Sequence, residues 1–313
     1  MRIVSFNIEN LAPWIRDDDG MRRLRHLVED LDAPDVLCLQ EIRVRAGDDD
    51  LVERMHRALR GYVCHASLPR DPRNVSYRGG RAYGVATYVR STLRPEPAHV
   101  PEWDREGRVV VTPLRAFTVI NVYLVNGTSR PWFDPDTGKV DGDRQAFKRR
   151  LQRLLMAEAK SHGDVVIIGD FNVSRTRIDV HPRLRTEGPH ALARKELNEI
   201  VIPELDVVDV FRELHPTERK YTWFEKRAAS MGRLDAARVD YALVSRALAS
   251  RVKEADIAQE MANRFGSDHA PLFIDVDPGT RPSAREPKAP ANRLSADRRA
   301  PSTTRSGRRG GRR

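Results

Sequence analysis

The chain has 313 residues, of which 40% are hydrophobic and 32% are charged. This composition supports one large core or two modest ones, and no run reaches the roughly 20 consecutive apolar residues that a membrane span requires. Residues 2–8 read RIVSFNI, a strand pattern rather than a secretory leader. We therefore expect neither a membrane protein nor a secreted precursor. Only two cysteines are present, which excludes a disulfide scaffold and a cysteine-rich zinc site.

The net charge of +10 is concentrated near the C-terminal end. Residues 281–313 carry eleven of the 55 basic residues and two of the 45 acidic ones, so 44 basic and 43 acidic residues precede them. Residues 278–313 contain no Phe, Tyr, Trp, Ile or Val and cannot bury enough apolar surface to offset their chain entropy. We expect a folded part over 1–277 and a disordered, Arg-rich tail over 278–313 that binds polyanions. A solvated tail without a specific role is the alternative.

Before residue 278, strand-like runs alternate with helix-like stretches. Apolar residues at helical spacing predict helices that begin near Met21 and Asp143, and a third over 190–201. The run VVII at 165–168 is apolar on both faces, as in a strand covered on both sides. This mixture predicts an α/β fold with helices layered on sheets, although periodicity does not give the number of sheets. Strands are predicted at 2–8, 36–41, 83–89, 116–124, 164–169, 239–244 and 271–276.

Polar residues recur where these strands begin or end. A carboxylate or amide beside a buried strand must find partners, because burying it unpaired is costly. If the strand ends meet, they form an oxygen-rich pocket that suits Mg²⁺ or Mn²⁺ rather than zinc. Taken singly, Asn7 is equally well explained by a turn, and Glu41 by an exposed position. The candidates are Asn7, Glu41, Asp170, Asn172, Asp240, Asp268 and His269.

The acidic runs 17–19 and 48–50 are also candidates for metal binding. The run 48–50 directly precedes Leu51, Val52 and Met55 at helical spacing. We therefore assign it to helix capping and compensation of the helix dipole.

Eight short motifs occur in an order that resembles the endonuclease/exonuclease/phosphatase superfamily, and most of all the exonuclease III type of apurinic/apyrimidinic (AP) endonuclease. The motifs are FN, LQE, YGVA, NVY, GDFN, YTWF, RVDY and SDHAP, and the similarity runs from Arg2 to about Asp277. The resemblance implies a four-layer sandwich, in which two packed, mainly antiparallel or mixed β-sheets are flanked by helices. We also expect a monomer.

The resemblance implies a role for each matching residue. Glu41 matches the acidic metal ligand, and Asn7 and Asp268 match the other members of the metal site. Asp170 matches the residue that orients or deprotonates the attacking water, with Asn172 as its companion at the phosphate. His269 matches the imidazole at the scissile phosphate, Asp240 the carboxylate that orients it, and Tyr123 the phenol beside that phosphate.

The same resemblance predicts some substrate contacts, and the positions of two arginines in the sequence predict others. The apolar pocket that receives a flipped abasic sugar in that branch corresponds to Trp223, Ala237 and Val239. Arg175 and Arg177 lie just past GDFN, and we expect them to clamp phosphates, with ordinary surface arginines as the alternative.

The predicted function is Mg²⁺- or Mn²⁺-dependent hydrolysis of duplex DNA at abasic sites and blocked 3′ ends, in base excision repair. The predicted location is cytoplasmic, at the nucleoid if the source is bacterial. Two departures from the AP endonuclease pattern, NIENL at 7–11 and Ile42 after the metal-binding Glu, favour an alternative within the superfamily. That alternative is a general nuclease, or a phosphatase or phosphodiesterase with another substrate. A DNA-binding protein without activity would leave the site residues unexplained.

Overall fold

The computed structural model describes residues 1–279 except 46, 70–82, 126–138, 140–143 and 185–190. The chain divides into two units, Met1–Thr280 and Arg281–Arg313, and the described residues belong to the first. The tail predicted over 278–313 lies almost wholly outside the described residues, so its boundary and its disorder stay predictions.

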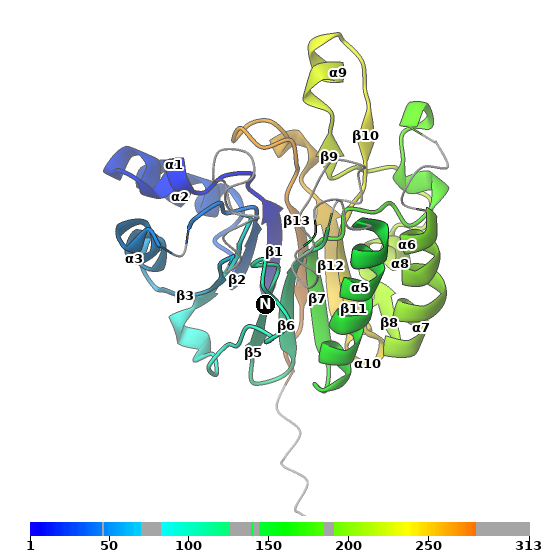
Figure 1. The fold of residues 1–313 in the computed structure, drawn as a ribbon, viewed down its shortest axis with the longest axis horizontal. Coiled ribbons are helices and arrows are strands. Elements are labelled where there is room, and N and C mark those ends of the chain that lie inside the picture. Colours follow the sequence, from blue (N-terminus) through cyan, green and yellow to red (C-terminus); the bar gives the residue numbers. More distant parts are fainter. Residues whose placement is uncertain (46, 70–82, 126–138, 140–143, 185–190, 280–313) are drawn as a thin grey trace, which may run out of the picture. The chain divides into compact units, whose positions relative to one another are not determined.

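Two mixed β-sheets form the centre of the first unit (Figure 1). Sheet A has the order β12-β13-β1-β2-β4-β3, with β1 (Arg2–Asn7), β2 (Val36–Gln40), β3 (Tyr62–Ser67), β4 (Val85–Arg90), β12 (Val252–Ile257) and β13 (Leu272–Val276). Sheet B has the order β5-β6-β7-β11-β8, with β5 (Val109–Pro113), β6 (Thr118–Tyr123), β7 (Val165–Asp170), β8 (Val207–Asp209) and β11 (Asp240–Ser245). A separate hairpin pairs β9 (Trp223–Phe224) with β10 (Ala236–Ala237).

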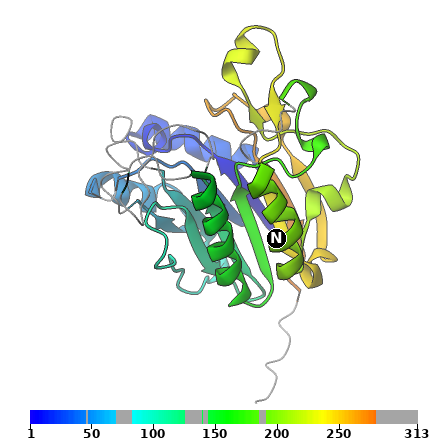
Figure 2. The same cartoon turned by 45° about the vertical axis from the view of Figure 1, so that its right-hand side comes forward.

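Helices cover the outer face of each sheet, and Figure 2 shows those over sheet B from the front. Sheet A is covered by α1 (Ala12–Ile15), α2 (Asp18–Asp30) and α3 (Asp49–Arg57), and sheet B by α5 (Arg144–Lys160), α6 (Ala191–Glu196) and α7 (Ile202–Leu205). Shorter elements are α8 (Val210–Leu214), α9 (Lys226–Ser230), α10 (Arg246–Ala249), the π-helix η4 (Leu197–Val201) and the 3₁₀ helices η1 (Ser91–Leu93), η2 (Arg177–Asp179), η3 (Pro182–Leu184) and η5 (Gln259–Met261).

Three apolar clusters hold these four layers together. Strand β7 shows the pattern: Val166 and Ile168 pack between the two sheets, whereas Val165 and Ile167 pack beneath α5. Both faces of β7 are therefore buried, as its continuous apolar run predicted. The third cluster lies between sheet A and helices α1–α3. The predicted four-layer α/β sandwich is confirmed.

The acidic runs before α2 and α3 cap these helices. The Asp17 carboxylate accepts a hydrogen bond from the amide of Gly20 at 2.8 Å, and that of Asp48 accepts one from Leu51 at 3.2 Å. Each carboxylate satisfies one of the amides that a helix start leaves unpaired. The capping assignment of the run 48–50 is confirmed.

One buried polar contact joins the inner faces of the sheets. Gln40 of β2 donates through Nε2 to Asn121 Oδ1 of β6 at 2.8 Å. Asn121 in turn donates to the carbonyl oxygen of Ala86 at 3.0 Å and to Oγ1 of Thr87 at 3.2 Å, both in β4. Gln40 and Asn121 are completely buried. Because each donor needs its partner in an apolar surrounding, this contact fixes the position of sheet A against sheet B.

Among the described residues, no helix has both the length and the apolar character needed to cross a membrane.

Replacing Asn121 by Ala tests the contact between the sheets. We expect Asn121→Ala to lower the free energy of unfolding by about 1–3 kcal/mol, because it removes one acceptor of the buried Gln40 amide and the donor to Ala86 and Thr87. Urea denaturation followed by circular dichroism measures the change. Lys253→Ala, on the exposed side of β12, is the control and should be near neutral. An Asn121→Ala protein as stable as the wild type would contradict this role.

Candidate active site

Sheet A brings three predicted site residues to one edge. Strands β1 and β2 are parallel, so Asn7 at the end of β1 lies beside the end of β2, directly before Glu41. Strand β13 runs antiparallel to β1, so His269, which precedes β13, comes to the same edge. Ser267 fixes this junction, because its Oγ donates to the Asn7 carbonyl at 2.6 Å and accepts from the His269 amide at 3.0 Å.

Sheet B contributes its residues in the same manner. Tyr123 ends β6 and Asp170 ends β7, and the two residues are partners in the parallel β6–β7 ladder. Asp240 begins β11, which is antiparallel to β7, and is paired with Asp170 in the β7–β11 ladder. Three residues far apart in the sequence thus lie at adjacent strand ends.

The side chain of Asn7 joins the two groups. Its Nδ2 lies 3.2 Å from Glu41 Oε1, 3.1 Å from Asp170 Oδ2 and 3.5 Å from His269 Nε2. Its Oδ1 accepts a hydrogen bond from the Glu9 amide at 3.0 Å, which fixes the direction of the amide group. Asn7 is 1% exposed. It therefore acts through its N–H groups, which hold carboxylates of both sheets in place.

His269 forms a buried pair with Asp240. Its Nδ1 lies 2.9 Å from Asp240 Oδ2, which leaves Nε2 facing the site. Burial alone would lower the pKa of the imidazole, but the Asp240 carboxylate outweighs it, with further contributions from Asp170 and Asp268. The pKa of His269 is raised to about 10. His269 is therefore a cation at neutral pH, held in a fixed orientation.

Asp170 is buried at the centre of the cluster, 1% exposed. Its Oδ1 accepts from the Asn172 amide at 2.7 Å, and its Oδ2 accepts from Asn172 Nδ2 at 3.0 Å. Burial and the neighbouring Asp240 charge raise the pKa of Asp170 to about 8. A carboxylate with a raised pKa binds a proton more strongly, which is the property required of a general base near neutral pH.

Glu41 is an anion held by Tyr123 and Arg43 in addition to Asn7. It follows β2 with φ of 52°, a left-handed conformation that turns its side chain toward the site. Oε1 accepts from the Tyr123 hydroxyl at 2.8 Å, and Oε2 pairs with Arg43 Nη2 at 2.7 Å. Burial would raise the pKa of Glu41, but the charge and hydrogen bond of Arg43, with help from Tyr123 and His269, lower it.

The donor set fits a hard divalent cation. The ligand oxygen atoms of Asp170 and Asp240 and a ring nitrogen of His269 lie within 4.8 Å of one another. Asp268 Oδ1 lies 4.0 Å from His269 Nε2, and Asp268 Oδ2 accepts from Trp223 Nε1 at 3.1 Å. Four carboxylates, including that of Glu41, gather at this edge, and oxygen-preferring cations occupy sites of this kind.

The three residues of the predicted pocket also lie beside this cluster. Trp223 of β9 pairs with Ala237 of β10, and an isolated bridge joins Trp223 to His269. Ala237 is buried, whereas Trp223 and Val239 are partly exposed. The hairpin that carries α9 between β9 and β10 projects beyond the sheets in Figure 1. The pocket role of these residues stays a prediction.

The two predicted phosphate clamps differ in their surroundings. Arg175 donates through Nε to Asn198 Oδ1 at 2.9 Å and through Nη1 to Asp209 Oδ2 at 2.8 Å. Its guanidinium is thus directed into the protein, away from the Asp170 cluster. Arg177 is exposed. The clamp role stays a prediction for both, and Arg177 has the accessible side chain.

Four basic residues that support the site were not singled out from the sequence. Arg43 holds Glu41, and Lys148 of α5 donates to the Asn172 carbonyl at 2.6 Å. Arg108 packs against the ring of Tyr123 and donates to its carbonyl oxygen at 3.1 Å. Arg238, 1% exposed, pairs with Asp179 at 2.8 Å and Asp209 at 2.7 Å. In the sequence, the signal for a buried Arg238 was a single arginine within the strand-like run RVDY.

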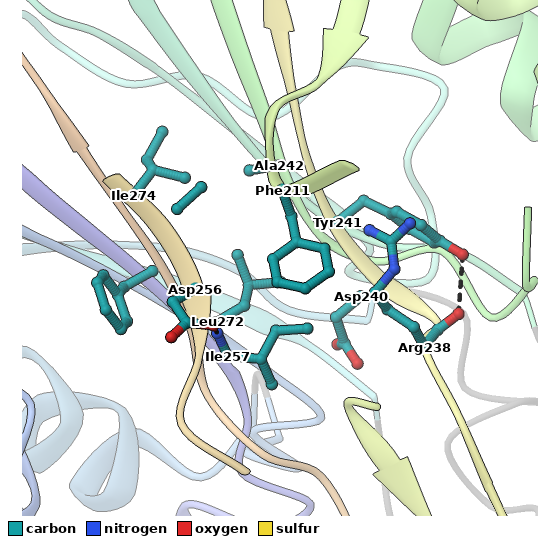
Figure 3. A pocket seen from close by; sticks show the side chains of 11 residues that line it. Phe211, Arg238, Asp240, Tyr241, Ala242, Asp256, Ile257, Leu272 and Ile274 are labelled. Atoms are coloured by element: carbon teal, nitrogen blue, oxygen red, sulfur yellow. Dashed lines mark hydrogen bonds between the residues drawn. The ribbon is translucent and has the colours of Figure 1, made fainter. Parts of the chain in front are cut away.

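A small pocket lies on the other side of Asp240, between α8, β11, β12 and β13 (Figure 3). Its walls are mainly apolar and include Phe211, Ile257 and Leu272. Beside it, the Tyr241 hydroxyl donates to the Arg238 carbonyl at 2.8 Å. Because few polar groups converge there, we do not assign it to the site at the strand ends.

A four-layer α/β sandwich that gathers carboxylates and a carboxylate-paired histidine at one edge of both sheets has the architecture of phosphoester-cleaving enzymes. The model of the Endonuclease/Exonuclease/phosphatase family matches residues 4–269. The chain belongs to this family, and the resemblance stated from its motifs is confirmed.

Individual relatives show which members of the family this chain is similar to. Recombination repair protein 1 of Drosophila melanogaster is 31% identical over 284 residues, which cover 88% of this chain but only 37% of that protein. The exodeoxyribonuclease of Bacillus subtilis is 27% identical over 286 residues, covering 88% of this chain and all of the relative. The solved structure of an AP endonuclease from Archaeoglobus fulgidus superimposes with a TM-score of 0.66 at 27% identity, over 88% of this chain and 99% of that one.

Replacing Asp240 by Asn tests the origin of the His269 charge. We expect Asp240→Asn to lower the pKa of His269 from about 10, because the carboxylate that favours the imidazolium is lost. Titration of the His269 ring protons by NMR, in metal-chelated buffer, measures the change. Asp206→Asn, which removes an exposed carboxylate paired with Arg246, is the control. An unchanged His269 pKa in Asp240→Asn would contradict the assignment.

The same pair makes stability depend on pH. The folded-state pKa of His269 lies above its ordinary value of 6.5, so the folded protein binds this proton more strongly than the unfolded chain. The stabilisation is complete below pH 6.5 and is lost as the pH rises through about 10. In metal-free buffer, the free energy of unfolding should therefore fall between these values, and fall less in Asp240→Asn.

Proposed function

We propose that this protein is a metal-dependent DNA phosphodiester hydrolase of the AP endonuclease and exonuclease III type, acting in base excision repair. The observation that carries the proposal is the meeting of Asp170, the His269–Asp240 pair and Glu41 around the Asn7 amide. The exodeoxyribonuclease and AP endonuclease relatives support DNA as the substrate. Such a protein works beside DNA, in the cytoplasm or at the nucleoid.

Asp170 orients a water molecule and takes its proton. Its carboxylate is fixed by Asn7 and Asn172, and its raised pKa favours proton uptake as the water attacks phosphorus. The attack forms the new P–O bond and breaks the bond to the 3′ oxygen, so no covalent enzyme intermediate is needed.

His269 stabilises the negative charge that develops on the phosphate. Asp240 keeps its ring protonated and directed, so Nε2–H donates to a non-bridging phosphate oxygen. The donor is already oriented before the substrate binds, which avoids the cost of reorganisation. Tyr123 and Arg43 hold Glu41 in a similar way.

Glu41 and Asp268, with Asn7 holding the neighbouring carboxylates, are the residues that would bind Mg²⁺ or Mn²⁺. The bound cation supplies neutralisation of the phosphate charge and stabilisation of the departing oxygen. Without a cation, four carboxylates at one edge would repel DNA.

The hairpin beside His269 favours an abasic substrate. Trp223 and Ala237 are paired beside His269, and with Val239 they would form the apolar slot into which a nucleotide without a base can be flipped at low cost. Arg177 would contact a flanking phosphate. The alternative substrate, an intact nucleic acid or another phosphate ester, is favoured by Ile42, which is completely buried and offers no polar group to the site.

Removing the Asp170 carboxylate or the His269 imidazole should strongly lower turnover. We expect Asp170→Asn and His269→Ala to lower kcat by about 10²–10⁴-fold, because each removes a group that acts in the transition state. The assay is Mg²⁺-dependent nicking of a duplex with one tetrahydrofuran site, with EDTA as the blank. Arg246→Ala, an exposed pair with Asp206, is the matched control and should keep full activity.

The substrates of that assay separate the two candidate functions. Nicking of the tetrahydrofuran duplex well above intact duplex and single strands supports the AP endonuclease assignment. Equal cleavage of all three supports a general nuclease, and activity confined to phosphate monoesters or lipid esters supports the alternative. Full activity in Asp170→Asn or His269→Ala would contradict the assigned roles.

Deleting residues 278–313 tests the Arg-rich tail. We expect weaker nonspecific DNA binding and a shallower dependence on salt, because each basic residue that neutralises a phosphate releases counterions. The value of kcat should hardly change. Fluorescence anisotropy on an intact duplex between 50 and 200 mM salt, about the range over which such contacts weaken binding strongly, gives the slope. An unchanged KM and salt slope would show that the tail does not engage DNA.

A further inference from the structure

We propose a second metal site, for Zn²⁺, formed by His99, Glu158 and His162. Glu158 lies in the last turn of α5, and His162 follows that helix. His99 lies in the extended segment before β5 and pairs with Val111 of that strand. Two separate parts of the chain thus supply three side chains with ligand atoms within 4.8 Å of one another.

The ligand atoms converge on one point. His99 Nε2 lies 2.8 Å and His162 Nε2 lies 3.2 Å from the same oxygen, Glu158 Oε1. Zinc binds imidazole nitrogen and carboxylate oxygen at about 2.0–2.2 Å, which places tetrahedral ligand atoms roughly 3.3–3.5 Å apart. A cation between these three atoms therefore requires only small side-chain rotations.

The backbone holds the ligands in position. The His99 amide donates to the Val111 carbonyl and the Val111 amide donates to the His99 carbonyl, both at 2.9 Å. The His162 amide donates to the carbonyl of Ala159 at 3.1 Å, and Ala159 is a buried residue of α5 that packs in the cluster over sheet B. Because little backbone ordering is needed on binding, most of the metal–ligand free energy remains available as affinity.

The chemistry of the ligands selects zinc. Two imidazoles and one carboxylate are the ligand set of open, three-ligand zinc sites, with water as the fourth ligand. The side chains of Glu158 and His162 are 16% and 17% exposed and that of His99 is 46% exposed, so an ion and its water have access. The carboxylate-rich cluster around Asp170, by contrast, prefers a hard cation such as Mg²⁺ to zinc.

The site is remote from the candidate active site. Lys148, which contacts Asn172, lies ten residues before Glu158 on the same helix, about 15 Å along its axis. Zinc at this place would tie α5 to the segment beside β5, and so hold the helix that carries Lys148 over sheet B. Its role is structural and does not depend on the proposed function.

Zinc titration of the full chain, by calorimetry in excess Mg²⁺, tests the site. We expect one bound zinc in the wild type, retained in His269→Ala, which removes the imidazole of the other cluster. The matched control is His26→Ala, because His26 forms an exposed pair with Glu29 at 3.0 Å. His99→Ala and His162→Ala should weaken binding by at least about tenfold, as loss of even a supporting contact does at metal sites.

Two further readouts decide the outcome. Zinc should raise the Tm of the wild type but not of His99→Ala, and Co²⁺ should give the visible absorption of a tetrahedral site in the wild type alone. His99 is exposed, so its replacement leaves the fold intact, and circular dichroism verifies this. No zinc uptake by the wild type, or uptake unchanged in His99→Ala, would overturn the proposal, and Glu158 would then serve only as the hydrogen-bond acceptor of both imidazoles.

Discussion

The Asn7 amide is the contact on which the candidate site depends. It belongs to sheet A, yet it donates to Asp170 of sheet B as well as to Glu41. Two sheets packed through apolar side chains alone could slide by a residue without losing much burial, since apolar packing is not directional. The Asn7 bonds and the Gln40–Asn121 contact below them are directional, so they remove that freedom. The fold thereby sets the site geometry before any ligand binds.

Electrostatics explains why basic residues surround this edge. Asp170 and Asp240 are buried close together beside the partly exposed Glu41, and ionised carboxylates in such a place repel one another. The protein offsets this repulsion by keeping His269 protonated and by pairing Glu41 with Arg43, and the remaining repulsion contributes to the raised pKa of Asp170. Electrostatically, a divalent cation can take the place of bound protons. The same arrangement thus accounts for the raised pKa of Asp170 and would favour a bound cation in the proposed function.

The strand and helix pattern and the residues of the central cluster could be predicted from the sequence, because alternating apolar runs and polar strand ends are local signals. Other features could not. The prediction missed strands β3, β5, β8, β9, β10 and β12. Strand β12 reads VKEADI, with two exposed charged residues that hide its period. Gly169 lies inside β7, and the sequence alone does not show why a glycine is needed there. There a Cβ would approach the Val122 carbonyl oxygen at 2.0 Å, so close packing of β6 against β7 requires the glycine. Nor can one sequence show which of many arginines is buried.

The buried arginines also bear on substrate selection. Arg238 stands between Ala237 and Val239, and its guanidinium is held by Asp179 and Asp209, which also bind Arg212 and Arg175. Removing one member of such a network leaves a buried charge without its partner, so the network resists displacement. The wall that carries Ala237 and Val239 is therefore rigid, whereas the Trp223 side chain on the opposing strand is held by the hydrogen bond from its Nε1 to Asp268. In the proposed function, this wall and the Trp223 ring would set the size of the sugar admitted beside His269, and Ala237 has the smallest side chain of the three.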